Sequence, residues 1–581
     1  MPTRMAAILT MAAAFICAGT EAAEMELDYS AFQAHGSPLM FGGVTADPSA
    51  PWDAYMAMGL TAIRQHIRSG SADFIKGKGL HYIAITNYNN NSHKVPTNWA
   101  DYENWMKGSF LLVKGKVDGV EVWNEPGPGF LDLSGTSYDN LDWVWQRLDE
   151  IYGTNDRSRL PKFAQAETYA IDNWSGNTPA QERDIEIKRV CAYLDIYYHT
   201  VRAIRSLDTT VAIGGPAAAG AHIRYLIHGF LGGILTDPRL ERKDVAFATF
   251  HTYYYIHEGM NPIYFWREIL REYGRPDLPV YMTEWNQDGG QWGTAQGMEE
   301  AGIPFNGQRL SNFFNTGMAG AHHYQMGQAH QNWKFFEGST IAPKARTWRL
   351  MSRELGLGMG PSTVVKFADS SALAREVRDS LINCCQDIAT NKFAEPEEWT
   401  SVMGAVNYQH KPVAVLSNWG NVSRAVNVEL KGLTGLSGQV PVKVFLASIG
   451  NDATQPAQTL SVNVTNGTIT FTGTQPRLSV MGLLVDAAVQ PPMPVSVDRP
   501  HTPCISRAPL DRIRIVGAGG SISLRNAAGP ARVGFFSPQG RCEGIWHIGT
   551  GNSVLRASSG HGIGIVTVEN GPHVTAARII R

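Results

Sequence analysis

Between Leu39 and Leu355 the hydrophobic pattern of the chain alternates between two periods. Short apolar runs, typical of buried β-strands, are separated by longer stretches in which apolar residues recur at the spacing of an amphipathic helix. The strand-like runs span residues 38–44, 60–67, 81–88, 119–125, 210–217, 245–253, 279–286 and 319–326. The clearest helical stretches span residues 181–208 and 263–274.

This alternation predicts the fold of the largest part of the chain. Eight strands that alternate with helices over residues 38–355 fit a (β/α)8 barrel, in which parallel strands close into a cylinder inside a ring of helices. The same pattern also allows an open, doubly wound parallel sheet. We expect the barrel, of α/β class.

After Gly360 the pattern changes to alternating strands with turn signals, such as TNGT at 465–468. Residues 360–487 are therefore predicted to form a β-sandwich packed on the barrel. Residues 489–500 form a Pro-rich linker. Residues 501–581 are Gly-rich and predict a small β module, which resembles the C-terminal sorting or binding modules of exported bacterial enzymes.

The N-terminus has the features of a secretory signal peptide over residues 1–23. Arg4 supplies a positive charge, residues 6–19 are apolar and small, and small residues follow up to Ala23. No later stretch is long and apolar enough to span a bilayer. We therefore expect a soluble protein that is secreted or periplasmic.

Five cysteines follow the signal peptide, and an exported protein can hold disulfides. Cys504 and Cys542 lie in the same terminal segment and are the expected pair. Cys384 and Cys385 are adjacent, so a bridge between them would strain the backbone. The odd count leaves at least one thiol unpaired.

Composition and charge exclude one class of partner. The formal net charge is −2 and 18% of residues are charged, which gives no sign of a polyanion partner such as nucleic acid. The chain contains 15 Trp and 20 Tyr. Aromatic faces suit sugar rings, but they also fill protein cores, so this count is compatible with either use.

Two acids stand at predicted strand ends. Glu125 lies in WNEP (123–126) after the fourth strand, and Glu284 lies in TEWN (283–286) at the end of the seventh. Because the carboxyl ends of barrel strands meet at one rim, these side chains would face each other across the mouth. Glycoside hydrolysis needs such a pair: one acid protonates the leaving oxygen and one carboxylate attacks the anomeric carbon.

The chain resembles the retaining glycoside hydrolases of clan A, and within it most closely family 39, which includes β-xylosidases and α-L-iduronidases. It is also similar in layout to agar- and porphyran-cleaving barrel enzymes. The motifs that carry the resemblance, in order, are IRQH (63–66), VEVWNEP (120–126), IGGPA (213–217), FHTY (250–253) and YMTEWN (281–286).

The resemblance implies roles for the residues in these motifs. Glu125 would be the acid/base and Glu284 the nucleophile, while Asn124 would bond the sugar 2-hydroxyl. Because a charged nucleophile disfavours a second charge nearby, it should also raise the pKa of Glu125.

Five further residues are candidates for binding substrate or supporting the acids. Arg64 should lie beside Glu284 and keep it ionised, Tyr253 should donate to Glu284, and His251 should line the same wall. His66 and Trp285 are candidate sugar contacts, and each could instead be a core residue.

The end of the eighth strand is rich in histidine. His322, His323 and Gln325 face the mouth if the strand register is right, and we carry that as an expectation. The spacing in HHYQMGQAH (322–330) matches no helical metal motif. We expect neither a metal nor another cofactor.

Two departures from the family pattern bear on the substrate. Gly127 follows WNEP where the family usually has Asn, and a long excursion rich in Trp and Tyr spans residues 128–179. This excursion is expected to face the substrate at the mouth, with a structural cap as the alternative.

These features favour an exported, endo-acting retaining hydrolase of β-linked polysaccharide or oligosaccharide. The alternatives are an exo-acting β-xylosidase-like enzyme, a transglycosylase, a noncatalytic glycan-binding barrel and a structural surface protein. The terminal module would sort the protein or bind glycan.

Overall fold

The structure is a computed structural model of the 581-residue chain. It describes residues 23–44, 51–86, 93–127, 130–161, 179–219, 227–253, 261–286, 295–324, 326, 335–337, 340–369, 400–418, 420, 422–493, 514–518, 521–527, 531–536, 542–548, 551–556, 564–570 and 573–579. The chain divides into two compact units, residues 1–492 and residues 493–581, which are described separately.

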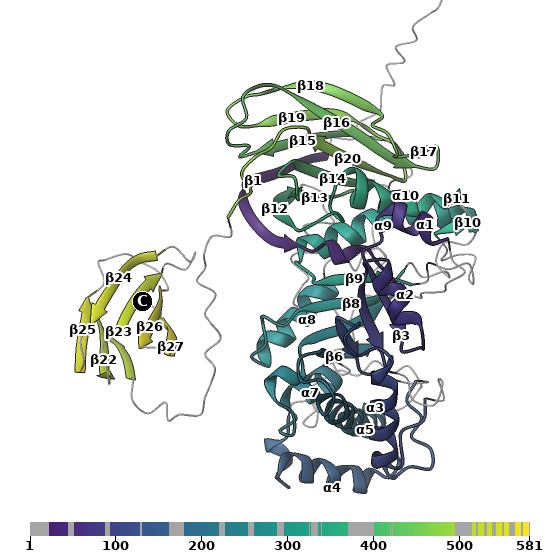
Figure 1. Cartoon of the computed structure of the whole chain (residues 1–581). Coiled ribbons are helices and arrows are strands. Elements are labelled where there is room, and N and C mark those ends of the chain that lie inside the picture. Colours follow the sequence, from purple (N-terminus) through teal and green to yellow (C-terminus); the bar gives the residue numbers. More distant parts are fainter. Residues whose placement is uncertain are drawn as a thin grey trace, which may run out of the picture. The chain divides into compact units, whose positions relative to one another are not determined.

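The first unit contains a closed barrel of eight parallel strands in sequence order (Figure 1). The strands are β2 (Gly42–Val44), β3 (Ala62–His66), β4 (His81–Ile85), β5 (Gly119–Glu121), β6 (Ala212–Ala218), β7 (Phe247–Thr252), β8 (Val280–Trp285) and β9 (Gly320–His323). Most of their residues are buried, as expected for parallel strands packed between a core and outer helices. The predicted (β/α)8 barrel is confirmed and the open sheet is excluded, because β9 pairs with β2.

Helices connect the barrel strands. They are α1 (Trp52–Met58), α2 (Ser71–Gly77), α3 (Trp99–Leu111), α4 (Leu141–Tyr152), α5 (Pro179–Arg205), α7 (Gly232–Thr236), α8 (Asn261–Glu272), α9 (Ala295–Asn315) and α10 (Pro343–Arg349). Local sequence sets their starts: Asn98 accepts hydrogen bonds from the backbone N–H groups of Ala100 and Asp101 and so caps α3. The predicted helices 181–208 and 263–274 correspond to α5 and α8.

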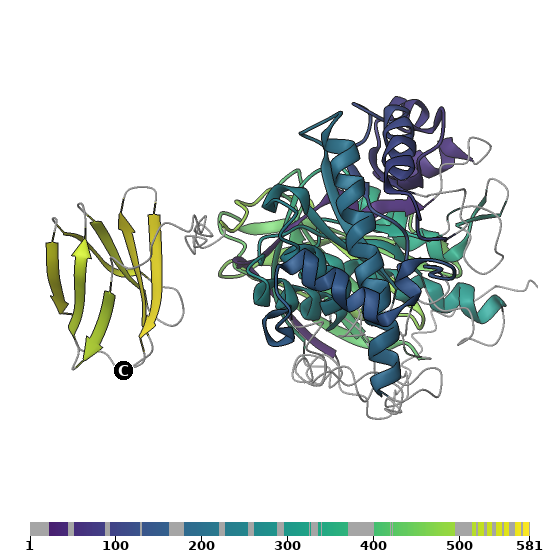
Figure 2. The same ribbon diagram turned by 90° about the horizontal axis from the view of Figure 1, so that it is seen from below.

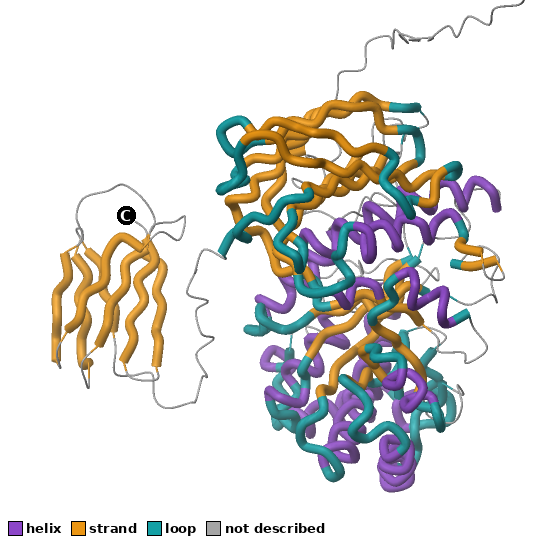
Figure 3. Tube along the Cα trace, turned by 45° about the horizontal axis from the view of Figure 1, so that its top comes forward, coloured by secondary structure: helices purple, strands orange, loops and turns teal. Residues whose placement is uncertain are grey.

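A mixed sheet folded as a β-sandwich follows the barrel in the chain (Figure 3). It is built from β12 (Ser362–Asp369), β13 (Thr400–Val406), β14 (Pro412–Asn418), β15 (Arg424–Lys431), β16 (Gly438–Ser448), β17 (Asn451–Asp452), β18 (Gln458–Val464), β19 (Ile469–Gln475) and β20 (Ser479–Val485), together with β1 (Ala23–Gly36).

The N-terminal strand β1 was not foreseen. It runs antiparallel to β12 and parallel to β15, so the sandwich includes residues that precede the barrel. Met25, Leu27 and Tyr29 alternate along it and lie in the sandwich core. No short-range signal in the sequence reveals a partner more than 300 residues away.

The barrel and the sandwich share a continuous core through α9. A Cβ atom on Gly307 of α9 would lie 2.4 Å from Ser417 Oγ and 2.5 Å from Val480 Cγ2, so the helix can approach the sheet only because this residue is glycine. Asn315 at the end of α9 donates to the carbonyl of Val402 at 3.3 Å. The sandwich therefore supports the last helices of the barrel.

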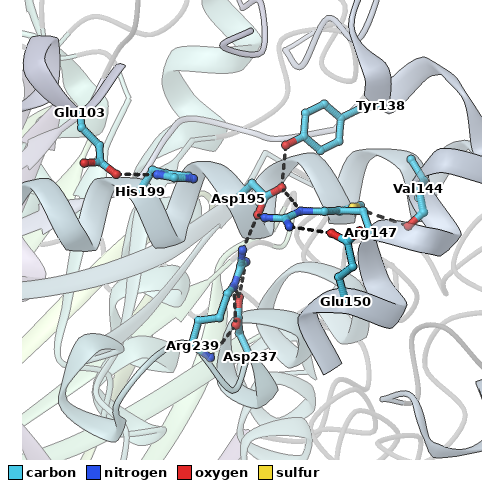
Figure 4. Close-up of polar contacts among 10 residues, drawn as sticks. Glu103, Tyr138, Val144, Arg147, Glu150, Asp195, His199, Asp237 and Arg239 are labelled. Carbon is cyan, nitrogen blue, oxygen red and sulfur yellow. Dashed lines mark hydrogen bonds and ion pairs between the residues drawn. The ribbon is translucent and has the colours of Figure 1, made fainter. Parts of the chain in front are cut away.

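Helix α4 of the excursion after β5 packs on α5, as the alternative of a structural cap predicts. Tyr138 and Arg147 of α4 and its entry turn both bond Asp195 of α5, and Arg239 pairs with the same carboxylate (Figure 4). Trp145 lies under the guanidinium of Arg157, with 3.9 Å between that group and the ring centre. Figures 1 and 2 place α4 away from the sandwich, against the outer helices.

Phe130 and Asp132, at the start of this excursion, contact His93 and Lys94 in the loop after β4, at the same end of the barrel as Glu125. The expectation that the excursion faces the substrate therefore stays a prediction. The aromatic residues of α4 cover the apolar face that this amphipathic helix turns toward α5. Tyr169 and Trp174 lie outside the described residues.

The second unit contains two antiparallel sheets, β21–β22–β25 and β24–β23–β26–β27. Their bounds are β21 (Arg514–Ala518), β22 (Ser521–Ala527), β23 (Ala531–Phe536), β24 (Cys542–Ile548), β25 (Gly551–Arg556), β26 (Gly564–Asn570) and β27 (His573–Ile579).

Several expectations concern residues outside the described ones. Cys384, Cys385 and Cys504 are among them, so the Cys504–Cys542 disulfide stays a prediction, while Cys191 is a buried free thiol. The expected signal peptide lies outside them except for Ala23, the first residue of β1. Among the helices that the structure describes, none has the length and apolar character needed to cross a bilayer.

Candidate active site

The chain turns sharply where it leaves β5, and this turn presents Glu125. The strand ends at Glu121 and not at Glu125, because the backbone adopts positive φ at Trp123 (69°) and at Glu125 (47°). Such angles cost about 1–3 kcal/mol each for residues other than glycine and occur at sites where the surroundings enforce them. The Glu125 N–H donates to the carbonyl of Ala217 at 3.1 Å, which holds the turn against β6.

Trp123 anchors this turn and does not offer a sugar platform. Its side chain is buried, its backbone N–H donates to Thr86 Oγ1 at 2.8 Å, and its indole N–H donates to the carbonyl of Phe130 at 2.9 Å. The strand-end acid is thus fixed from both sides.

A register shift presents Glu284 on β8. His251 of β7 pairs with Glu284, whereas the preceding Phe250 pairs with Met282, so Thr283 is an extra residue in the ladder. Such bulges re-aim side chains and are frequent beside active sites. Thr283 and Glu284, although adjacent, both contact residues of the barrel interior: Thr283 bonds Glu121 and Glu284 bonds Arg64.

The two predicted acids meet across the mouth. One oxygen of Glu125, one oxygen of Glu284 and a ring nitrogen of His251 all lie within 4.8 Å of one another. Retaining glycosidases place their carboxyl groups about 5–5.5 Å apart, whereas inverting enzymes need about 6.5–9.5 Å to admit a water molecule. The close approach of one oxygen of each acid is compatible with the retaining arrangement.

Arg64 forms hydrogen bonds to three residues of the site. Its Nη1 donates to Glu284 Oε1 at 2.5 Å, its Nη2 to Asn124 Oδ1 at 2.8 Å, and its Nε to Glu121 Oε2 at 2.5 Å. Burial opposes the charge of Arg64, but Glu121 and Glu284 outweigh it and raise the pKa of the guanidinium. Arg64 therefore stays charged and holds Glu284 and Asn124 in place.

Tyr253 and His251 bond the acids from β7 and the loop that follows. The Tyr253 hydroxyl donates to Glu284 Oε2, and burial followed by the charge of Glu284 raises its pKa, so it remains a donor. His251 Nδ1 lies 2.7 Å from Glu125 Oε1 and 3.8 Å from Glu284 Oε2.

The pKa of Glu125 lies below its ordinary value, opposite to the expectation from the sequence. Burial raises this pKa, but the hydrogen bond and charge of His251, with help from Arg64, outweigh it. The sequence argument considered only the repulsion from Glu284 and not the histidine bonded to the acid.

His66 is the last residue of β3 and lies near Arg64. Burial first, and then the positive charges of Arg64 and Arg68, lower its pKa to about 4, so the ring is neutral near neutral pH. Its Nδ1 is buried and has no hydrogen-bond partner among the described residues. The role of His66 as a sugar contact stays a prediction.

Trp285 is not a substrate contact, and this prediction is corrected. Its side chain is 1% exposed, and its ring packs 5.3 Å from the ring of Phe313 and 6.1 Å from that of Trp348, in the layer between barrel and helices. Side chains alternate along a strand, so the residue after Glu284 points outward.

The histidines at the end of β9 are also core residues. His322 and His323 are fully buried, and the His323 ring packs 4.8 Å from the ring of Trp285. The next residue, Tyr324, instead meets the site, with its ring 5.7 Å from the ring of Tyr253. Gln325 lies outside the described residues.

Sequence reasoning missed three residues of the site, namely Glu121, Thr283 and Tyr324. Glu121 carried a signal, because it is an acid between Val120 and Val122 in a run that is otherwise apolar. Thr283 and Tyr324 carried none, since their orientation depends on the register shifts around β8 and β9.

The arrangement of the site suits proton transfer better than the binding of a metal ion. By distance alone Glu125, His251 and Glu284 could surround a cation. Arg64 and Tyr253 already occupy Glu284, and His251 occupies Glu125. The buried guanidinium would also repel a cation bound there.

Comparison with known proteins shows a likeness of fold. No known family profile and no curated protein matches the sequence. A glucosidase from Croceicoccus marinus aligns with a TM-score of 0.51 at 11% identity, over 81% of this chain and 100% of that one. A structure from Neocallimastix frontalis aligns with a TM-score of 0.50 at 12% identity, over 81% and 100%.

A GH39 enzyme from Xanthomonas axonopodis pv. citri aligns with a TM-score of 0.48 at 13% identity, over 80% of this chain and 97% of that one. At such identities the likeness is one of fold.

Proposed function

We propose that the protein is a retaining glycoside hydrolase that cleaves β-linked polysaccharide or oligosaccharide. The observation that carries this proposal is the closeness of Glu125 and Glu284, whose oxygens lie within 4.8 Å at the ends of the fourth and seventh barrel strands. The glucosidase that shares the fold supports it, and so do the clan A motifs of the sequence.

In the first step Glu284 attacks the anomeric carbon. The bond from this carbon to the leaving oxygen breaks, that oxygen takes the proton of Glu125, and a covalent glycosyl-enzyme forms on Glu284. Arg64 and Tyr253 hold the two oxygens of Glu284 for this attack. A proton shared between Glu125 and His251 Nδ1, 2.7 Å apart, is then available to the leaving group.

In the second step water takes the place of the leaving group. Glu125, now a carboxylate, accepts a proton from water, whose oxygen attacks the anomeric carbon and frees Glu284. Asn124 Oδ1 is held by Arg64, which leaves its amide N–H groups to donate to the sugar 2-hydroxyl. That bond strengthens as charge develops on the sugar.

The finer assignment rests on the sequence. We propose that the enzyme is exported, that it acts within longer glycans, and that it is related to the family 39 enzymes. The module after residue 493 folds as a unit of its own, which suits a part that sorts the protein or binds glycan.

A panel of polysaccharides tests the proposal. The wild-type protein should release oligosaccharides with retained anomeric configuration from at least one β-linked glycan, and Glu284→Ala should release none. Glu429→Ala, which removes a half-buried acid of the sandwich, is the matched control and should retain full turnover. Binding of a glycan without any cleavage, or products of inverted configuration, would contradict it.

A further inference from the structure

A third carboxylate, Glu121, lies beneath the two catalytic ones. It is the last residue of β5 and is fully buried. Its Oε2 accepts from Arg64 Nε at 2.5 Å and its Oε1 accepts from Thr283 Oγ1 at 2.7 Å. Both oxygens are therefore satisfied inside the protein, and the group does not face the mouth.

The charges around Arg64 explain why a third acid is useful. In the resting site one buried guanidinium serves two carboxylates, Glu121 and Glu284, at 2.5 Å each. When Glu284 becomes a glycosyl ester, it loses its charge. Without Glu121 the guanidinium would then be a buried cation with no charge partner at that distance, a state of high free energy.

Thr283 shows that Glu121 is held in a set orientation. The register shift in β8 that aims Glu284 at the mouth also aims Thr283 at Glu121. The same irregularity of one strand thus places the nucleophile and the residue that orients the third carboxylate.

We infer that Glu121 is a positioning residue that keeps Arg64 paired while Glu284 is esterified, so that Arg64 and Asn124 stay in place through both chemical steps. The kinetic effect expected of Glu121 rests on the proposed function. Its expected effect on stability rests on the contacts of Arg64 alone. Glu121 touches neither substrate nor the reacting atoms.

A double-mutant cycle of thermal unfolding tests the inference without turnover. Glu284→Gln imitates the uncharged nucleophile of the glycosyl-enzyme, and Glu121→Gln removes the other partner of Arg64. Each single variant leaves one carboxylate on Arg64 and should cost little, whereas the double variant should lose more stability than the sum of the two. Additive losses would overturn the inference.

Asp244 supplies the matched control for this cycle. It pairs with Arg205 at 2.9 Å outside the barrel mouth and is also buried. Asp244→Asn should be destabilising in its own right, yet its effect should add to that of Glu121→Gln, because the two acids share no partner.

The two chemical steps should respond differently to Glu121→Gln. Arg64 would pair only with Glu284, so esterifying Glu284 becomes harder and freeing it becomes no harder. With phenyl β-cellobioside or β-xylobioside, where formation of the glycosyl-enzyme limits the rate, turnover should fall by roughly tenfold or more. With the dinitrophenyl glycosides, where hydrolysis of the intermediate limits the rate, it should not fall.

Equal losses on both kinds of glycoside would indicate a merely structural role and overturn the inference. A wild-type protein that cleaves no aryl glycoside and no glycan would instead contradict the proposed function, and the unfolding cycle would still decide the role of Glu121.

Discussion

His251 stands between the two acids, with Nδ1 2.7 Å from Glu125 Oε1 and 3.8 Å from Glu284 Oε2. Its side chain is fully buried, and it pairs with Glu284 across the β7–β8 ladder. A neutral imidazole can accept a proton from Glu125 at Nδ1 or donate one to it. His251 therefore has a strong influence on the protonation of Glu125, the proposed acid/base.

Replacing His251 by Phe should shift the pH dependence of the enzyme. The hydrogen bond that lowers the pKa of Glu125 is lost, while burial still raises it, so the pKa of Glu125 increases. The acid then keeps its proton to higher pH, and the alkaline limb of the kcat/KM profile moves upward. His251→Asn, which keeps a donor near the Nδ1 position, should move it less, and an unshifted limb in both variants would rule this out.

Removing the proton donor should discriminate between leaving groups. Glu125→Ala should lose about 10²–10⁴-fold in turnover on glycans, whose leaving oxygen needs a proton. It should lose far less in the first step on dinitrophenyl glycosides, because their leaving group departs without a proton. Initial rates on both substrate classes measure this, and an equal loss on both would contradict the acid role of Glu125.

Tyr253→Phe should weaken the nucleophile without displacing it. The variant removes one hydroxyl that donates to Glu284 Oε2, while the 2.5 Å bond from Arg64 remains. Without the hydroxyl the carboxylate is less well oriented for attack, and a misplacement of about 1 Å can cost about 10²-fold, so kcat/KM should fall by roughly 10- to 100-fold. Circular dichroism should show an unchanged fold, and an unchanged kcat/KM would show that the hydroxyl does not act on Glu284.

The ion-pair network on α5 should matter for stability and not for catalysis. Asp195 is fully buried and accepts from Arg147, Arg239 and Tyr138, so Asp195→Ala leaves two arginines without this partner (Figure 4). The expected cost is about 3–5 kcal/mol in the free energy of unfolding. At a temperature where the variant is folded, kcat should be unchanged, and a fall in kcat would show a link between α4 and the mouth.

The same group predicts a pH dependence of stability. Burial raises the pKa of Asp195, but its hydrogen bond from Arg147 and the charge of Arg239 lower that pKa by more than burial raises it. The pKa in the folded protein therefore lies below the ordinary value of about 3.9. Its contribution is present above the unfolded pKa and is lost as the pH falls through the folded pKa. Unfolding of Asp195→Asn should therefore depend less on pH below about 4 than that of the wild type.

A chain that ends at Pro492 should keep the chemistry. Residues 493–581 form a separate unit, whereas the barrel and sandwich belong together. Turnover of soluble oligosaccharides should equal that of the full chain, while binding to an insoluble glycan should weaken if the module holds it. Equal binding of the two chains in a pull-down with insoluble glycan would leave sorting as the role of the module.

The sequence by itself determined the barrel and the pair of acids. Strand and helix periods are local properties, so eight strands could be located without knowing their partners. Once they close into a barrel, strand ends share one rim, and this brings Glu125, Glu284, Arg64, Asn124, His251 and Tyr253 together.

Only the tertiary structure decided which neighbouring side chains face the mouth. A shift of one residue turns a strand side chain to the opposite face, and the extra residue Thr283 makes such a shift inside β8. Because of this shift, Trp285 lies in the core outside the barrel and Thr283 donates a hydrogen bond to Glu121. The place of β1 in the sandwich likewise depends on pairing across the whole chain, which no local pattern encodes.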